Sequence, residues 1–171
     1  MRGAIDTARA AGVTLAVLGG HRLNVKRGFR FTPWPSIRFH GMVGGREKFA
    51  LLNRSRGMIF PVRWHEPFGL AIIESLYFGC PVFSTPYGSL SELVDPQVGY
   101  LSNSCADLAR AVASMRFDRR LCHEYARDSF NARAMAEAYV GLYERVLNGE
   151  KLNPVRPELI DRNVSKLPWL G

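Results

Sequence analysis

Short apolar runs alternate with helical patterns along the first two thirds of the chain, and this alternation restricts the folds that the sequence can form. The runs LAVLGG, MIFPV and CPVFSTP are each typical of a buried strand, and helical stretches separate them. Strands that alternate with helices pair in parallel through right-handed crossovers. The order therefore predicts an α/β fold with a doubly wound parallel sheet, and three helical stretches after residue 104 predict a helical C-terminal ending.

Turn residues and caps give the expected bounds of these elements. The first helix is expected to stop at Gly12, and the strand VTLAVLGG after it is expected to be buried on both faces. In the polar, basic stretch that follows, only SIRFHGMV looks extended. Ser89 and Glu92 form a capping-box pattern at the start of a short helix. The sequence carries three prolines from Asn148 onward, so we expect one domain over residues 1–147 and a tail or tether over residues 148–171.

Composition excludes several classes of protein. The chain has 171 residues, 47% of them hydrophobic and 22% charged, which suits one folded domain and argues against disorder. No apolar run approaches the ~18 residues of a membrane-spanning helix, and no signal peptide is visible. We therefore expect a cytoplasmic protein, with peripheral contact with a membrane left open. Cys80, Cys105 and Cys122 lie at no metal-binding spacing and are expected to be buried, reduced thiols.

Positive charge is concentrated in the first third of the chain. Residues 1–63 carry 12 basic and 2 acidic side chains, whereas residues 64–171 carry 11 and 13. Nucleic acid, nucleotide phosphates, anionic lipid and an acidic neighbouring domain are all partners that fit this imbalance, and a solvated Arg-rich surface is an equal alternative. Aromatic residues lie among the arginines and fit a nucleic-acid surface, an acceptor loop or packing between domains: Phe29, Phe31, Trp34 and Phe39.

Two carboxylates flank the expected start of a helix in the stretch WHEPFGLAIIESLYFGCPVFSTPYG. Pro67 and Gly69 suit the first turn of a helix that follows a parallel strand. The free N–H groups and the positive dipole end of such a helix suit a phosphate. Glu74 falls within an apolar helix, so we expect it to be partly buried and to need protein donors or ligand hydroxyls. Glu66 would lie beside the phosphate. The spacing therefore predicts that one acid accepts hydroxyls of a nucleoside and the other accepts hydroxyls of a transferred group, with the diphosphate at the helix start between them.

The run from Glu66 to Val94 resembles the donor-site signature of retaining glycosyltransferases of the GT-B fold, in particular glycosyltransferase family 4, the group 1 family. The pattern is E-P-F-G-L-x-x-x-E, then G-x-P-V, then a glycine turn and a further Glu. The sequence matches it at Glu66, Pro67, Phe68, Gly69, Leu70, Glu74, Gly79, Pro81, Val82, Gly88 and Glu92. Flanking pieces extend the resemblance over roughly residues 3–147. It implies a Rossmann-like donor-binding domain, the C-terminal half of a GT-B enzyme.

The resemblance also implies roles for single residues. Glu74 would hold the ribose hydroxyls, and Glu66 would be the catalytic residue that holds the donor sugar. The other donor-binding positions are the helix start, the glycine turn after the first strand and two residues near the base: Phe68, Gly69, Leu70 and Ala71; Gly19 and Gly20; Met42 and Val43. No metal or other cofactor is expected, because the helix dipole and cationic side chains would offset the charge of the leaving diphosphate.

The implied reaction is hexosyl transfer from a nucleotide-sugar, with retention of configuration, to a sugar, lipid or small-molecule acceptor. It would serve the biosynthesis of glycan, polysaccharide or glycolipid. In this family an acceptor-binding domain lies upstream, and the first strand of the donor domain, with the Arg and Lys that clamp the diphosphate, would fall before Met1. We therefore expect a fragment or one subunit of a split protein, which needs an N-terminal domain or a partner chain. Arg22, Lys26 or Arg30 could replace the clamp.

Other interpretations stay open from the sequence. A fragment that binds the nucleotide-sugar without transferring it is the first alternative; a nucleic-acid binder that uses the basic first third is a weaker one, so no nucleic-acid partner is expected. Structural roles are open for Glu74, for Glu66 as an acid at a helix start, and for Phe68 as core packing. His65 is interpreted as a loop residue rather than a base, and His21 has no motif behind it.

Overall fold

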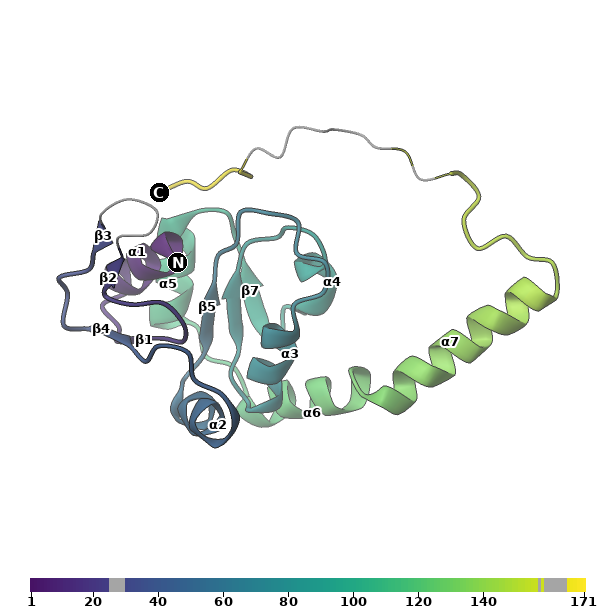
Figure 1. The fold of residues 1–171 in the computed structure, drawn as a ribbon, viewed down its shortest axis with the longest axis horizontal. Coiled ribbons are helices and arrows are strands. Elements are labelled where there is room, and N and C mark those ends of the chain that lie inside the picture. Colours follow the sequence, from purple (N-terminus) through teal and green to yellow (C-terminus); the bar gives the residue numbers. More distant parts are fainter. Residues whose placement is uncertain (25–29, 157, 159–165) are drawn as a thin grey trace.

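The computed structural model describes residues 1–24, 30–156, 158 and 166–171 (Figure 1). It confirms the alternation of strands and helices and the helical ending. The helices are α1 (Arg2–Ala10), α2 (Gly45–Arg54), α3 (Leu70–Tyr77), α4 (Leu90–Leu93), α5 (Cys105–Ser114), α6 (Arg119–Ser129) and α7 (Ala132–Leu147). The strands are β1 (Leu15–Val17), β2 (Leu23–Asn24), β3 (Arg30–Phe31), β4 (Ile37–Phe39), β5 (Met58–Phe60), β6 (Val82–Ser84) and β7 (Gly99–Leu101).

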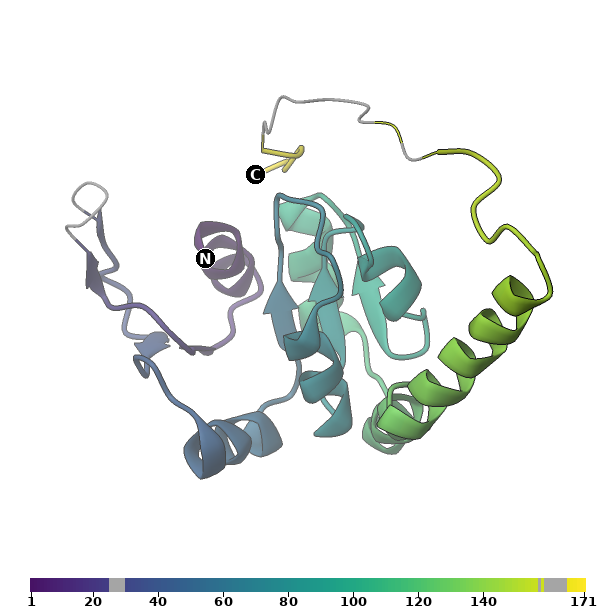
Figure 2. The ribbon, with the colours of Figure 1, turned by 45° about the vertical axis from the view of Figure 1, so that its right-hand side comes forward.

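The parallel strands form two separate sheets. β5, β6 and β7 pair side by side in that order, and β1 pairs with β4. Figures 1 and 2 both show β1 between β4 and β5. The resulting order matches the doubly wound order 3-2-1-4-5-6 except that no described strand takes its central position, between β1 and β5. The expected first strand before Met1 stays a prediction.

Helices cover both faces of the β5-β6-β7 sheet. Successive residues of β6 point to opposite faces, as the period of a strand requires. Val82 packs with Ile72 of α3 and Cys122 of α6, whereas Phe83 packs with Leu108 of α5. This three-layer arrangement holds the loops at the carboxyl ends of the strands on a rigid support.

Helix α1 connects the two sheets through its apolar face. Ile5 and Ala8 are buried against Ile37 of β4, and Ile59 of β5 packs against the same cluster. The prediction that the first strand is buried on both faces is wrong. Ala16 of β1 is exposed, because α1 packs on only one face of this strand.

The stretch between β1 and β4 contains an antiparallel pair, β2 with β3, that the sequence did not predict. Each strand has two residues, too few to leave a periodic pattern. Trp34 and Phe39 pack against the core around Ile37, whereas Phe31 is exposed. Phe29 lies outside the described residues, so the four aromatic residues do not form one described stacking surface.

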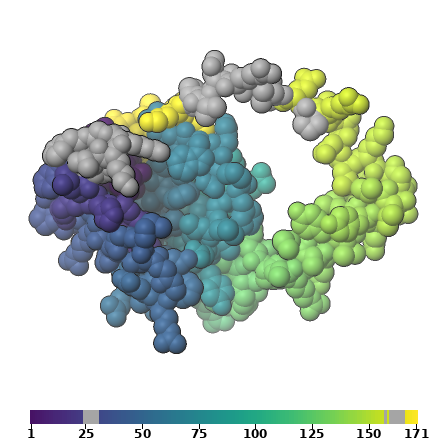
Figure 3. All heavy atoms as spheres, viewed as in Figure 1, coloured from purple at the N-terminus to yellow at the C-terminus, as the bar shows by residue number. Residues whose placement is uncertain are grey.

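Helix α7 stands away from the rest of the molecule (Figure 3). None of its residues is buried. Across the described residues, no helix combines the length and the apolar composition that crossing a bilayer requires. The assignment of residues 148–171 as a tail or tether stays a prediction, although residues 167–171 return to the body, as described below.

The three cysteines are buried, free thiols, as predicted. Burial raises the pKa of the Cys122 thiol from 9.0 to about 11, with the neighbouring Cys80 thiol as a further cause. Burial likewise raises the pKa of Cys80. Because the thiolate is the reactive form, both side chains are protected by protonation as well as by lack of access.

Iodoacetamide labelling at different pH values tests this protection. The upward shift of the Cys122 pKa from 9.0 to about 11 lowers its thiolate fraction at pH 8 about 100-fold. We expect negligible labelling of the native chain at pH 8 and labelling of all three cysteines in denaturant. Labelling of native Cys122 should then rise as the pH approaches its pKa. Rapid modification of the native chain at pH 8 would contradict this.

Candidate functional site

The start of α3 presents unpaired N–H groups to solvent. Gly69 caps the helix with φ of 89°, a left-handed conformation that suits glycine. Ile72 and Ile73 donate their N–H groups to the Gly69 carbonyl, and no described residue accepts the N–H groups of Gly69, Leu70 or Ala71. Leu70 and Ala71 are exposed. These three N–H groups and the positive end of the helix dipole can therefore receive an anion.

Glu66 is held by backbone contacts with the loop that follows β6. It forms a parallel bridge with Gly88, and the Ser89 N–H donates to the Glu66 carbonyl at 2.9 Å. Gly88 has φ of 65°, and a Cβ atom there would overlap the backbone of Glu66. The close approach of the two loops therefore requires glycine at this position.

The carboxylate of Glu66 is oriented by an indole. Trp64 Nε1 donates to Glu66 Oε2 at 3.0 Å. Glu66 is only partly buried. Its remaining lone pairs can therefore accept hydrogen bonds from a ligand, on the side of the loop that leads into α3.

Glu74 lies on the second turn of α3 and pairs with a lysine of α2. Lys48 Nζ is 2.6 Å from Glu74 Oε1, and the two side chains are 26% and 42% exposed. No described residue donates to Oε2 of Glu74. Glu74 is thus partly buried and partnered, as predicted. No pattern in the sequence indicated Lys48, because a contact between residues 26 positions apart arises only in the fold.

The remaining predicted residues gather at the carboxyl ends of β1 and β4. Gly19 and Gly20 both have positive φ, and the Gly19 N–H donates to the Gly41 carbonyl at 2.6 Å. A Cβ atom at Gly19 would lie 3.6 Å from Met42 Sδ, so the glycine turn touches the Met42 loop. Met42 is 92% exposed, and Val43 is next to it.

Helix α2 connects this second group with Glu74. The helix begins at Gly45, directly after the loop of Met42 and Val43. It carries Lys48, which binds Glu74 of α3. The loop before α3 that carries Glu66 (residues 61–69, the Glu66 loop) leads directly into α3, and the loop before α2 that carries Met42 (residues 40–44, the Met42 loop) leads directly into α2. The Lys48–Glu74 ion pair joins these two helices.

The sequence profile described as "Glycosyl transferases group 1" matches residues 3–117 of the chain. The chain belongs to this family. The matched range includes both carboxylates, the start of α3, the glycine turn after β1 and the Met42 loop.

Three similar proteins are each longer than this chain. The O-antigen chain mannosyltransferase C of Escherichia coli is 25% identical over 160 residues, which cover 85% of this chain and 43% of the relative. A glycosyltransferase involved in avilamycin A biosynthesis superposes with a TM-score of 0.65 and 24% identity, over 86% of this chain and 48% of that one. The sucrose-phosphate synthase of Thermosynechococcus elongatus superposes with a TM-score of 0.60 and 23% sequence identity, over 87% of this chain and 43% of the synthase chain.

These likenesses show that the fold is that of a GT-B glycosyltransferase. The chain spans less than half the length of each of these three proteins. The family match over residues 3–117 includes the run from Glu66 to Val94.

Two residues in the run from Glu66 to Val94 behave differently from the predictions. Ser89 does not cap α4 in a capping box with Glu92. Its hydroxyl instead donates to the Phe68 carbonyl at 3.0 Å, because the bridge at Gly88 brings the two loops together. Phe68 is not core packing, since it is 44% exposed and meets Phe130 edge-on with ring centroids 6.3 Å apart.

The Arg22 side chain hydrogen-bonds to the backbone of residues 32–37, so it does not fit the role of diphosphate clamp. Its guanidinium donates to the carbonyl oxygens of Thr32, Trp34 and Ile37 at 2.7, 3.3 and 2.8 Å. It therefore holds the stretch between β1 and β4 in place. Lys26 and the side chain of Arg30 lie outside what the structure describes.

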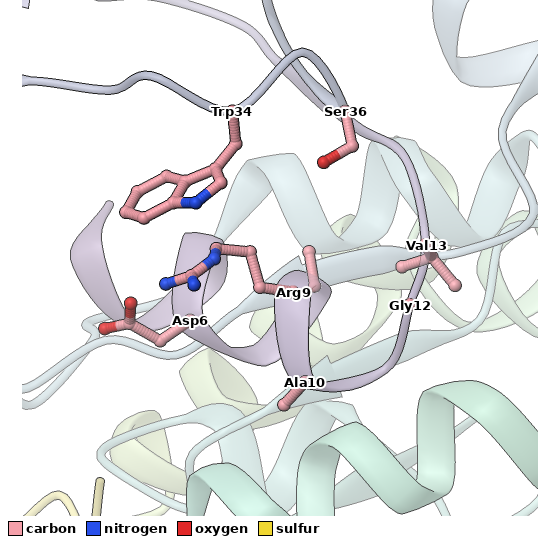
Figure 4. A pocket seen from close by; sticks show the side chains of 8 residues that line it. Asp6, Arg9, Ala10, Gly12, Val13, Trp34 and Ser36 are labelled. Atoms are coloured by element: carbon pink, nitrogen blue, oxygen red, sulfur yellow. The ribbon is translucent and has the colours of Figure 1, made fainter.

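A pocket of about 520 Å³ lies between α1 and residues 34–36, away from both carboxylates and the start of α3 (Figure 4). The Arg9 guanidinium lies 3.7 Å from the centroid of the Trp34 ring in a cation–π contact, and Asp6 also lines the pocket. None of the predicted site residues lines it. The described residues contain no group of three or more His, Cys, Asp or Glu that could hold a metal ion.

The close approach of Gly88 to Glu66 can be tested against a matched glycine. Gly12 has a similar φ of 68°, but a Cβ atom there would meet nothing within 4 Å. Gly12→Ala should therefore lower the free energy of unfolding by about 1–2 kcal/mol, the cost of the left-handed conformation alone. Gly88→Ala should cost more than about 3 kcal/mol, because strain and backbone overlap add. Urea unfolding measures both, and equal costs would contradict the tight contact.

Proposed function

We propose that this chain is the donor-binding half of a retaining glycosyltransferase of family 4, which transfers a hexosyl group from a nucleotide-sugar. The observation that carries the proposal is the start of α3, where three N–H groups that no described residue accepts lie between Glu66 and Glu74 along the chain. A nucleotide-sugar has the same order of groups, with a diphosphate between two polyhydroxy rings. Membership of the group 1 family supports this reading.

In the proposed complex the diphosphate lies on the N–H groups of Gly69, Leu70 and Ala71. Their hydrogen bonds and the helix dipole favour the negative charge that develops on the leaving diphosphate. No metal is needed for this role in the proposal. The Gly19–Gly20 turn, which carries no side chains, lets backbone come near the sugar or the phosphates.

Glu74 binds the ribose in this arrangement. Lys48 holds Oε1 of the carboxylate, and Oε2 accepts a ribose hydroxyl. The base lies near Met42 and Val43, where the exposed Met42 side chain offers a polarisable apolar surface for a flat ring. Glu66, oriented by Trp64, accepts hydroxyl hydrogens of the donor sugar.

The proposed reaction retains the configuration of the sugar. The acceptor hydroxyl approaches the anomeric carbon from the face that the diphosphate leaves. The bond from that carbon to the phosphate oxygen breaks as the bond to the acceptor oxygen forms, and the leaving phosphate oxygen takes the acceptor proton. The chain contributes the positions of the reacting groups and the charge stabilisation of the leaving group.

We propose that transfer also needs an acceptor-binding half, in the same polypeptide or in a partner chain. The facing edges of β1 and β5, which no described strand pairs, leave room in the sheet order for one further strand of the donor-binding half itself. The name of the mannosyltransferase relative favours a hexosyl donor and a polysaccharide acceptor, and a lipid or small-molecule acceptor fits the same chemistry. The unfilled strand position favours a second candidate, a chain that binds the nucleotide-sugar but transfers nothing by itself.

Replacement of Glu74 tests the nucleotide end of the site. Glu74→Gln should weaken binding of the nucleoside diphosphate that the chain prefers among UDP, GDP and ADP about tenfold or more, because a charged acceptor for ribose is lost. The 2′,3′-dideoxy analogue should bind both proteins alike. Glu124→Gln, which breaks the exposed Arg120–Glu124 pair, is the matched control and should leave calorimetric affinities unchanged. Equal affinity of wild type and Glu74→Gln for the nucleoside diphosphate would contradict the role of Glu74 in binding the ribose.

Replacement of Glu66 tests the sugar end separately. Glu66→Ala should leave the affinity for the nucleoside diphosphate unchanged and weaken binding of its sugar conjugate about tenfold. Calorimetric titration of both ligands measures the two effects in one series. A variant that loses both affinities to the same extent would show that Glu66 supports the fold rather than the sugar.

A further inference from the structure

Residues 167–171 return to the body of the molecule and contact loops that follow three adjacent strands. We call these five residues the clasp. The Leu167 N–H donates to the Arg63 carbonyl at 3.1 Å, and Arg63 Nε donates back to the Leu167 carbonyl at 2.8 Å. The Tyr87 hydroxyl donates to the Pro168 carbonyl at 2.6 Å. Figures 1 and 2 show the segment near the carboxyl ends of the strands.

The far end of the clasp is anchored on α5. The Leu170 N–H donates to the Asn103 carbonyl at 2.9 Å, and the Leu170 carbonyl accepts the Cys105 N–H at 2.7 Å in the first turn of the helix. Trp169 packs against the apolar cluster of α5 and β6 that contains Leu108. Gly3 of α1 lies so close that a Cβ atom there would be 3.3 Å from the Trp169 ring.

The clasp is anchored although the described chain before it is exposed and irregular. Residues 150–156, which lead toward the clasp, are exposed and form no helix or strand. Ordering a peptide after such a stretch costs conformational entropy, which the five backbone and side-chain hydrogen bonds and the packing of Trp169 must offset. The contacts are therefore specific to these residues rather than a general property of the tail.

The clasp meets the Glu66 loop at two points. Arg63, which exchanges hydrogen bonds with Leu167, precedes Trp64, and Trp64 orients the Glu66 carboxylate. Tyr87, which binds Pro168, packs its ring edge-on against His65, with ring centroids 6.4 Å apart. Tyr87 also directly precedes Gly88, the residue that bridges to Glu66.

We propose that the clasp is a positioning element for Glu66. It fixes the loop after β5 relative to the loops after β6 and β7, so that the Trp64–Glu66 pair keeps one orientation toward the donor sugar. This inference rests on the proposed function for its ligand, but the mechanical link from the clasp to Glu66 can be tested without any ligand. The clasp residues do not touch the donor in this account and act only through Arg63 and Tyr87.

Three full-length variants test the link. Tyr87→Phe removes the hydroxyl that binds the clasp and keeps the ring against His65. Trp169→Ala removes the main apolar anchor. Tyr125→Phe is the matched control, because it removes a tyrosine hydroxyl bound to another backbone carbonyl, that of Leu93, away from the clasp.

Hydrogen exchange of single amides gives the ligand-free readout. The Ser89 amide, bonded to the Glu66 carbonyl, reports on the Glu66 loop, and the Cys105 amide reports on the clasp. In Tyr87→Phe and Trp169→Ala we expect Ser89 to exchange about tenfold faster, while the Ser102 amide, bonded to Ser84 in the sheet, keeps its rate. Tyr125→Phe should leave the exchange rates of the Ser89 and Cys105 amides unchanged. Faster exchange at Cys105 with an unchanged rate at Ser89 would overturn the proposal.

Calorimetry gives the functional readout. Releasing the clasp should weaken binding of the nucleotide-sugar several-fold more than binding of the matching nucleoside diphosphate, since only the sugar meets Glu66. A purely stabilising role would weaken both ligands equally, and that result would overturn the positioning role. If the wild-type chain binds neither ligand, the proposed function fails, while the exchange of Ser89 still decides whether the clasp holds the Glu66 loop.

Discussion

The parallel pairing of β5, β6 and β7 is the constraint on which the site depends. Because all three strands run the same way, the loops after them emerge at one edge of the sheet. That edge brings Glu66 beside Gly88, and the clasp beside Arg63 and Tyr87 in the same two loops. The backbone bridge at Gly88 then leaves little freedom for the chain that leads into α3, so the acid and the helix start keep a constant relation.

The two carboxylates are placed by different means, which suits different tasks. Glu66 sits in a loop, oriented by an indole N–H and by backbone contacts. Glu74 sits on a helix and shares its carboxylate with Lys48. An ion pair that remains partly open to solvent contributes only about 0–1 kcal/mol to stability, so the effect of Lys48 is to fix the direction of one oxygen. In both cases one carboxylate oxygen is held by protein, while partial exposure leaves the group within reach of a ligand.

The structural features that the sequence could predict are local in the chain. The strand and helix order, the buried thiols and the glycine at the start of α3 each follow from a short pattern of residues. Contacts between distant residues leave no such pattern, which is why Lys48 was missed. The same holds for the clasp, since its hydrogen bonds use mainly backbone groups. It also holds for Ser89, whose hydroxyl donates to the Phe68 carbonyl and does not accept the N–H of Glu92 as a capping box requires. The exposure of Ala16 reflects how the sheets are covered, a property of the whole fold.

In the proposed complex, the start of α3 binds the diphosphate of a nucleotide-sugar. Titration of the ¹⁵N-labelled chain with UDP-, GDP- and ADP-sugars, followed by amide NMR, tests it most directly. We expect one donor to shift the amide resonances of Gly69, Leu70 and Ala71 most strongly, with smaller shifts around Glu74 and Met42. Shifts confined to another surface, such as the Arg9–Trp34 pocket, would contradict it. So would the absence of shifts when the acceptor-binding half is also present.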